Sequence, residues 1–136
     1  NKSAMTLSDQ FCVERHKLSF LDLVKNKLDI TFANEQEIKS LIDTSKFEDV
    51  ITFGKQLNKS LIITRGEKGS VAIIKNEVVE CESEKKLKII DLTGAGDLFA
   101  AGFLHGYINN LSTKESLMKG TEMSSKVIQK IGARLD

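Results

Sequence analysis

Residues 90–103 read IDLTGAGDLFAAGF, and they place one acid, Asp97, directly behind Gly94, Ala95 and Gly96. Small residues let the backbone approach a ligand closely, and their N–H groups can surround an anion together with the first N–H groups of a following helix. Because two glycines in a row of three lower the stability of a purely structural turn, this composition indicates a binding role. A carboxylate beside an anion site repels the ligand. Its presence there is therefore best explained by a chemical task.

Three kinds of phosphate-binding loop compete for this stretch. A P-loop requires GxxxxGK[ST], and neither this loop nor residues 66–70 supply the Lys–Ser/Thr pair. A dinucleotide loop requires GxGxxG, but Phe99 stands at the third glycine position and Asp97 would repel the pyrophosphate. In phosphoryl transfer to an alcohol, amides stabilise the transferred group while a carboxylate takes the proton of the attacking hydroxyl. That chemistry gives Asp97 a task, and the structural alternative is an acid that favours the first turn of a helix.

The chain around this loop alternates strand-like and helix-like stretches. We predict strands at residues 4–8, 29–33, 60–64, 70–75, 77–81 and 87–91, and helices at residues 11–28, 34–42, 46–57, 98–110 and 113–130. The pair 70–75 and 77–81 is predicted to form a hairpin. The alternation predicts an α/β fold with a mostly parallel sheet, in which ligands lie outside the carboxyl ends of the strands. Asn34, residues 64–69 and residues 91–97 fall at such ends.

Helical spacing also predicts which side chains are buried. Apolar residues of the first helix are expected to share one face, and these are Phe11, Leu18, Leu21, Val24 and Leu28. The small residues Ala100, Ala101 and Gly102 are expected to pack their helix closely against the sheet. In the last helix, Met118 and Met123 have the spacing of core residues.

The composition is that of a soluble globular domain. The chain has 136 residues, of which 40% are hydrophobic and 29% charged, with a net charge of +1. This charge gives no reason to expect nucleic acid or an anionic membrane as a partner, and no apolar run approaches the ~18 residues of a membrane span. No secretory leader opens the sequence, and Cys12 and Cys81 fit no disulfide or zinc pattern. A cytoplasmic location with reduced thiols is therefore expected.

Four stretches, in chain order, resemble the motifs of one enzyme family. Residues 91–103 are similar to the signature near the C-terminus of the ribokinase-like (PfkB-type) sugar and nucleoside kinases. NEQE at 34–37 resembles the family's Asn-x-x-Glu motif, and TRGEKG at 64–69 resembles its Thr-x-Gly-x-x-Gly nucleotide turn. Residues 120–133 are similar to the last helix, which lines the adenine pocket. The resemblance covers nearly the whole chain, and residues 7–37 most resemble bacterial adenosine-kinase-like members.

The resemblance implies a role for the acid and for the small residues before it. Asp97 is expected to be the catalytic base, and Gly94, Ala95 and Gly96 are expected to form the anion hole for the transferred phosphoryl group.

The resemblance also implies the contacts of the cofactors, which are ATP and Mg²⁺. ATP is expected to contact Asn34, Thr64, Gly66, Gly69 and Thr121. Glu37 is expected to act on magnesium-bound phosphate through water, because Mg²⁺ keeps several waters. A monovalent cation such as K⁺ is expected at Asp91 and Thr93, although Leu92 departs from the small polar residue usual between them.

The implied fold is a ribokinase-like three-layer α/β/α domain, and residues 1–136 correspond to its C-terminal, ATP-binding half. Family members are usually more than twice this length. The N-terminal half, which would carry the lid and most contacts to the acceptor, is expected to lie outside this chain.

Three functional hypotheses follow. The first is ATP-dependent phosphotransfer to a hydroxymethyl group of a sugar or nucleoside, incompetent without the missing half. The second is a non-catalytic nucleotide-binding fragment or decayed remnant, which would self-associate or bind a partner that supplies the N-terminal half. The third is a dinucleotide-binding domain, since Glu115 lies about 20 residues beyond Gly94, where an acid would bind the ribose.

Overall fold

The computed structural model describes residues 4–7, 13, 15–82 and 95–123. The chain divides into two compact units. The first groups Asn1–Thr64 with Ala72–Val78, and the second groups Arg65–Val71 with Val79–Asp136.

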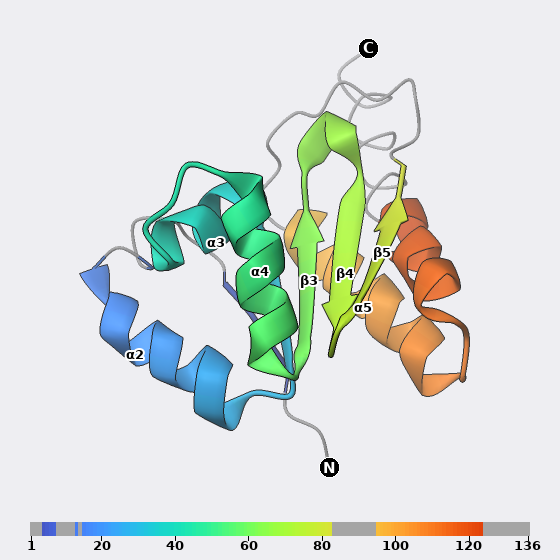
Figure 1. The fold of residues 1–136 in the computed structure, drawn as a ribbon. Helices are drawn as coiled ribbons and strands as arrows, with labels where there is room; N and C mark the ends of the chain where they lie inside the picture. Colours follow the sequence, from blue (N-terminus) through green and yellow to red (C-terminus); the bar gives the residue numbers. More distant parts are fainter. Residues whose placement is uncertain (1–3, 8–12, 14, 83–94, 124–136) are drawn as a thin grey trace. The chain divides into compact units, whose positions relative to one another are not determined.

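Five strands form one sheet in the order β1-β2-β3-β4-β5 (Figure 1). Strands β1 (Ala4–Thr6), β2 (Ile30–Asn34) and β3 (Ser60–Thr64) are parallel. Strands β4 (Ser70–Ile74) and β5 (Glu77–Cys81) follow one another through the predicted tight turn. The α/β sheet with a hairpin is thus confirmed, although the described sheet is mixed, with parallel pairing shown for β1, β2 and β3. The predicted strand 87–91 lies outside the described residues.

The centre of the sheet is apolar on both faces, as parallel strands covered by helices require. Leu61, Ile62 and Ile63 of β3 are all fully buried, and most of β2 is buried as well. This explains why the continuous apolar run SLIIT at 60–64 was sufficient to predict β3 with its observed bounds.

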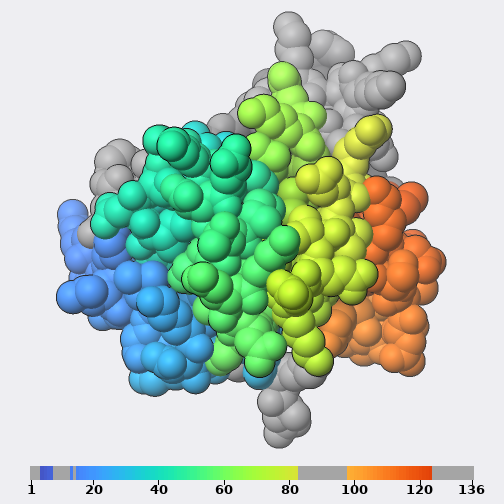
Figure 2. All heavy atoms as spheres, in the orientation of Figure 1, coloured from blue at the N-terminus to red at the C-terminus, as the bar shows by residue number. Residues whose placement is uncertain are grey.

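In the first unit, α3 (Glu35–Leu41) and α4 (Phe47–Leu57) pack against β2 and β3. Helix α4 buries Val50 and Gly54, while most of its other residues lie on the surface seen in Figure 2. Gly54 allows a close approach to the sheet, since a Cβ on it would lie 2.6 Å from Cδ1 of Ile73. Helix α4 ends at Asn58, whose left-handed backbone (φ 56°, ψ 30°) is a common way to terminate a helix.

The predicted helix 11–28 is interrupted in the structure. Helix α2 spans Lys17–Asp22 after a turn at His16, and a π-helical turn follows at Leu23–Lys27. Hydrogen bonding by Asn26, and then pairing with Lys27, hold the pKa of the exposed Asp22 carboxyl below its usual value.

The predicted apolar face of this segment is only partly correct. Val24 and Leu28 are buried, but Leu18 is 82% exposed. At 3.6 residues per turn, a separation of six residues rotates Leu18 by about 120° away from Val24 around the helix axis. Because Leu18, Leu21 and Val24 are each three residues apart, they drift around the helix axis, and Leu18 leaves the buried face. Phe11 lies outside the described residues.

In the second unit, α5 (Ala95–Ile108) packs against a helix that covers residues 113–123. A Cβ on Gly102 would lie 2.5 Å from the carbonyl oxygen of Lys119, and one on Gly120 would lie 2.8 Å from the carbonyl oxygen of Phe99. The prediction that Gly102 serves packing against the sheet is therefore corrected, because its close neighbour is another helix. Ala101 is exposed, whereas Ala100 is buried.

The core role expected for the two methionines is wrong. Met118 is 54% exposed and Met123 is 38% exposed. The buried side of their helix is formed instead by Ser116, Leu117 and Gly120. Across the part of the chain that the structure describes, no helix has the length and apolar character needed to span a bilayer.

Candidate functional site

The carboxyl ends of β2 and β3 bring together two of the predicted nucleotide-binding residues. Asn34 is the last residue of β2, Thr64 is the last residue of β3, and the two are register partners in the parallel pair. The strand-end geometry expected from an α/β sheet is therefore present, with two polar side chains on adjacent strands. Asn34 was predicted to begin the following helix, but it is the last residue of β2 and the N-cap of α3.

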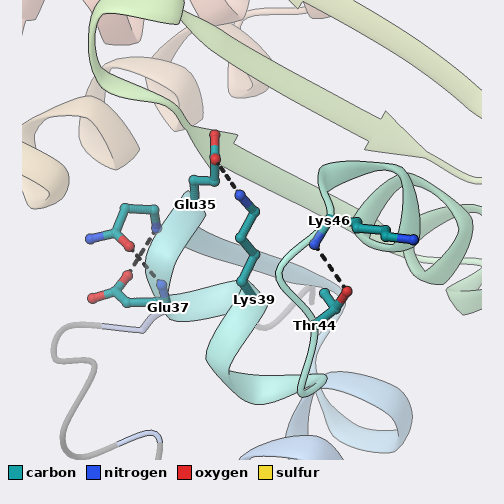
Figure 3. A network of polar contacts seen from close by, with 6 residues as sticks. Glu35, Glu37, Lys39, Thr44 and Lys46 are labelled. Carbon is teal, nitrogen blue, oxygen red and sulfur yellow. Dashed lines mark hydrogen bonds and ion pairs between the residues drawn. The ribbon is translucent and has the colours of Figure 1, made fainter.

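Asn34 and Glu37 form a reciprocal capping box at the start of α3. The Glu37 backbone N–H donates to the Asn34 Oδ1 at 2.8 Å, and the Asn34 backbone N–H donates to the Glu37 Oε1 at 2.9 Å. Glu37 is only 5% exposed, whereas Asn34 is exposed. The two residues that sequence analysis assigned to phosphate and magnesium are thus bonded to each other, and Figure 3 shows Glu37 in this network.

A second acid in the same turn is paired with a lysine. The Lys39 ammonium lies 2.6 Å from the Glu35 carboxylate, one helical turn away, and both side chains are less than a fifth exposed (Figure 3). This pairing neutralises one of the two negative charges next to Asn34, where a nucleotide phosphate is expected. The Glu35–Lys39 pair was not predicted, although a separation of four residues is typical of helical ion pairs.

The predicted nucleotide turn lies in the second unit and depends on its two glycines. Gly66 has φ 61° and Gly69 has φ 93°, values that side chains rarely adopt. The Arg65 N–H donates to the Gly69 carbonyl at 2.7 Å, which closes the turn around a short 3₁₀ segment, Gly66–Lys68. Both glycines are therefore required by the backbone itself, whatever else they contact.

Thr121 lies on the helix of residues 113–123 and is half-buried. Its hydroxyl donates to the Leu117 carbonyl at 3.0 Å, one turn earlier. In this arrangement the hydroxyl bonds to the backbone of its own helix. The contact of Thr121 with the adenine remains a prediction.

The structure describes the loop at residues 91–97 only from Ala95 onward. Helix α5 begins at Ala95, so Ala95, Gly96 and Asp97 form its first turn, three residues before the predicted start at Leu98. The first N–H groups of a helix have no intrahelical partner, which suits residues expected to bind an anion.

Several predicted site features fall outside what the structure describes. Gly94, Asp91 and Thr93 lie outside the described residues, as do the side chains of residues 95–97. The roles of Asp97 as a base and of Asp91 and Thr93 as cation ligands remain predictions.

Glu115, which the dinucleotide hypothesis assigned to a ribose, has a structural partner. The Ser112 N–H donates to the Glu115 Oε1 at 3.4 Å, and the Glu115 N–H donates to the Ser112 Oγ at 3.1 Å. This is a second capping box, and the Ser-x-x-Glu spacing at 112–115 is a sequence signature of it. The position of Glu115 is therefore explained without a dinucleotide.

The described residues fit magnesium only with the help of other ligands. No group of three or more His, Cys, Asp or Glu side chains is gathered for a metal ion within them. Mg²⁺ commonly binds through one or two carboxylates together with waters and nucleotide phosphates. A single acid near the strand end is compatible with that mode, whereas a cage built entirely of protein ligands has no counterpart in the described part of the chain.

Comparison with known proteins places the chain in one family. Residues 3–136 match the model of the pfkB family carbohydrate kinases. The chain is 33% identical to a ribokinase of Lactococcus lactis, covering 86% of this chain and 36% of that protein, and 36% identical to a cytidine kinase of Thermococcus kodakarensis, covering 80% and 40%. It superposes on the adenosine kinase of Sinorhizobium meliloti with a TM-score of 0.89 at 39% identity, covering 96% of this chain and 40% of that one.

The similarity confirms the ribokinase-like α/β fold and the resemblance seen in the motifs. The chain spans about two fifths of the length of these relatives. It belongs to the pfkB family of carbohydrate kinases.

Proposed function

We propose that this chain is the ATP-binding portion of a kinase that phosphorylates a hydroxymethyl group of a sugar or nucleoside. Family membership supports the reaction class. The observation that carries the proposal is the pairing of Asn34 with Thr64 at the ends of two parallel strands, where an α/β sheet binds its ligand.

In this proposal the chain's residues have separate tasks. Asn34, Thr64, Gly66, Gly69 and Thr121 contact ATP. The amides of Gly94, Ala95 and Gly96 stabilise the charge on the transferred γ-phosphoryl group, since preorganised N–H groups act most strongly where charge develops.

The proton and the metal are handled by acidic residues. Asp97 accepts the proton of the attacking hydroxyl. Mg²⁺, when bound, neutralises phosphate charge, and the family resemblance associates Glu37 with magnesium-bound phosphate through water. Asp91 and Thr93 are the proposed K⁺ site.

The acceptor proposed here contains ribose. Two of the relatives are named for the ribonucleosides adenosine and cytidine, and a third is named a ribokinase. A hydroxymethyl group on a ribose ring is the feature that these acceptors share. Because ATP is the donor, the cytoplasm is the proposed place of action, and the free, buried Cys81 is compatible with a reducing compartment.

A second candidate is a nucleotide-binding module without kinase activity. The strand-end residues Asn34 and Thr64, which support nucleotide binding, do not by themselves require a transfer step. In both candidates the proposed partner is the N-terminal half of such a kinase, or a second copy of this chain. A kinase assay of the chain alone, and again with an added N-terminal half, distinguishes them: activity only in the mixture supports the kinase, and activity in neither supports the module.

We expect the 136-residue chain to bind Mg-ATP in preference to NAD. Titration calorimetry should show saturable binding of one Mg-ATP and no measurable heat with NAD. At a Mg-ATP concentration about 100 times the Kd, the free energy of unfolding should rise by about 2.7 kcal/mol, which a thermal melt would detect. Binding of NAD without ATP would contradict the proposed function.

A further inference from the structure

The predicted nucleotide turn, residues 64–69, carries one lysine that has no task in the proposed function. We propose that the Lys68 ammonium group binds the phosphate chain of ATP as a point charge. This assignment rests on the proposed function. It adds a side chain that makes the site favour a polyphosphate over an uncharged nucleoside.

The residues proposed to contact ATP supply no positive charge. They are Asn34, Thr64, Gly66, Gly69 and Thr121, all of them uncharged. The triphosphate of ATP carries several negative charges, and a bound Mg²⁺ neutralises only part of them. A protein cation near the phosphates would offset the remainder, and lysine is a common phosphate ligand that acts as a point charge.

Three backbone donors of the turn are already used inside the turn. The Arg65 N–H donates to the Gly69 carbonyl at 2.7 Å, and the Gly69 N–H donates to the Gly66 carbonyl at 3.0 Å. The Lys68 N–H donates to the Arg65 carbonyl at 3.2 Å. These amides cannot also bind a phosphate without opening the turn, which leaves its side chains as the larger source of donors.

Among the charged side chains of the turn, that of Lys68 is available to a ligand. Lys68 is exposed, and its ammonium group has no ion pair or hydrogen bond with another residue that the structure describes. Glu67 would repel a phosphate, and Arg65 already has other interactions. The Lys39 ammonium, by contrast, is bonded to the Glu35 carboxylate. Lys68 can therefore bind an anion without losing a contact within the described part of the chain.

The turn holds the backbone of Lys68 in place. Residues Gly66–Lys68 form the 3₁₀ segment, and the positive φ angles of Gly66 and Gly69 close it on either side. A lysine side chain is long and flexible, so its ammonium can reach a ligand beside a fixed backbone. Because Lys68 is exposed, its attraction for phosphates is expected to weaken as salt is added.

The decisive variant is Lys68→Gln in the 136-residue chain, which removes the charge and keeps a long polar side chain. We expect the Kd for Mg-ATP to rise about fivefold at low salt, because an exposed ion pair with phosphate is lost. At about 0.5 M salt, where the Debye length is roughly 4 Å, the difference should fall below about twofold. The Kd for adenosine, which has no phosphate, should not change. Titration calorimetry measures these values.

Two further variants separate the charge of Lys68 from its other properties. Lys68→Arg keeps the positive charge and should keep the Kd for Mg-ATP within about twofold of the unchanged chain. Lys55→Gln is the matched control, because Lys55 is an exposed lysine in the last turn of α4, outside the proposed site. It makes the same change in net charge and should also alter the Kd less than about twofold. A thermal melt verifies that each variant is folded.

Specific outcomes would overturn this assignment. If Lys68→Gln binds Mg-ATP at low salt as tightly as the unchanged chain, Lys68 does not contact the phosphates. If it loses as much affinity for adenosine, or as much at high salt, the change acts through the shape of the turn. If Lys55→Gln has an equal effect, the loss reflects net charge alone. Failure of the unchanged chain to bind Mg-ATP would instead contradict the proposed function itself, and this assignment with it.

Discussion

In an active kinase that contains this chain, Asp97→Asn is expected to lower kcat by about 10²–10⁴-fold with little change in the affinity for ATP. The amide of Asn has nearly the shape of the carboxylate but cannot accept the proton of the attacking hydroxyl. The backbone amides of Gly94, Ala95 and Gly96 remain, so the nucleotide should still bind. Steady-state kinetics with ATP and a ribose-containing acceptor, combined with ATP titration, measure the two quantities separately.

Glu48→Gln provides a control for the loss of one negative charge. Glu48 is an exposed acid in the first turn of α4, outside the proposed site. It should leave kcat within about twofold, since charges on the surface are screened by salt. An Asp97→Asn enzyme that turns over at the unaltered rate would remove Asp97 from the mechanism, whereas a loss explained wholly by weaker ATP binding would make it a binding residue.

A second large effect is expected from Gly102→Ala, on stability rather than on chemistry. If helix propensity alone decided the outcome, this change would stabilise α5 by about 1 kcal/mol. The structure predicts the opposite sign, because the added Cβ would lie 2.5 Å from the Lys119 oxygen and 2.9 Å from the Gly120 Cα. Both neighbours belong to the backbone and cannot rotate away. We expect a destabilisation of about 2 kcal/mol, which corresponds to a fall of about 8 °C in Tm.

Ala101→Gly is the matched control for Gly102→Ala. Ala101 is the exposed neighbour in the same helix, so replacing it measures propensity without packing. It should destabilise by about 1 kcal/mol. Denaturant unfolding of both variants gives the comparison, and a Gly102→Ala protein more stable than the starting chain would show that α5 and residues 113–123 do not pack as described.

Local sequence patterns were sufficient to predict an element where its apolar residues determine both its secondary structure and its burial. The run SLIIT predicted β3 with the observed bounds, because a strand buried on both faces is apolar at consecutive positions, here Leu61, Ile62 and Ile63. The bounds of α3 and α4 were also predicted to within a few residues. The prediction of one helix at residues 11–28 was less accurate, because its apolar residues do not stay on one face and Leu18 is exposed.

Contacts between distant segments could not be read from the sequence. The closeness of Gly102 to Lys119 depends on how two helices cross, and nothing in either helix alone specifies its partner. The burial of Leu117 rather than Met118 depends on the same crossing.

In the candidate site, too, some features could be predicted from the sequence and others could not. The sequence correctly predicted that Asn34 and Thr64 fall at the carboxyl ends of strands, and the structure adds that the two strands are neighbours. The contact between Asn34 and Glu37 was missed, although Asn-x-x-Glu before an apolar residue is also compatible with a capping box. The Asn-x-x-Glu spacing is compatible both with a helix cap and with ligand binding. Only a structure shows which atoms the cap already uses.

The central claim is that the amides of Gly94, Ala95 and Gly96 hold the transferred phosphate beside the Asp97 carboxylate. Its most direct test is a crystal structure of the chain with Mg²⁺ and a non-hydrolysable ATP analogue. The account predicts γ-phosphate oxygens about 3 Å from these backbone nitrogens, with the Asp97 carboxylate facing the same phosphoryl group. Amides bonded to other parts of the protein, or an Asp97 side chain directed away from the bound phosphate, would contradict it.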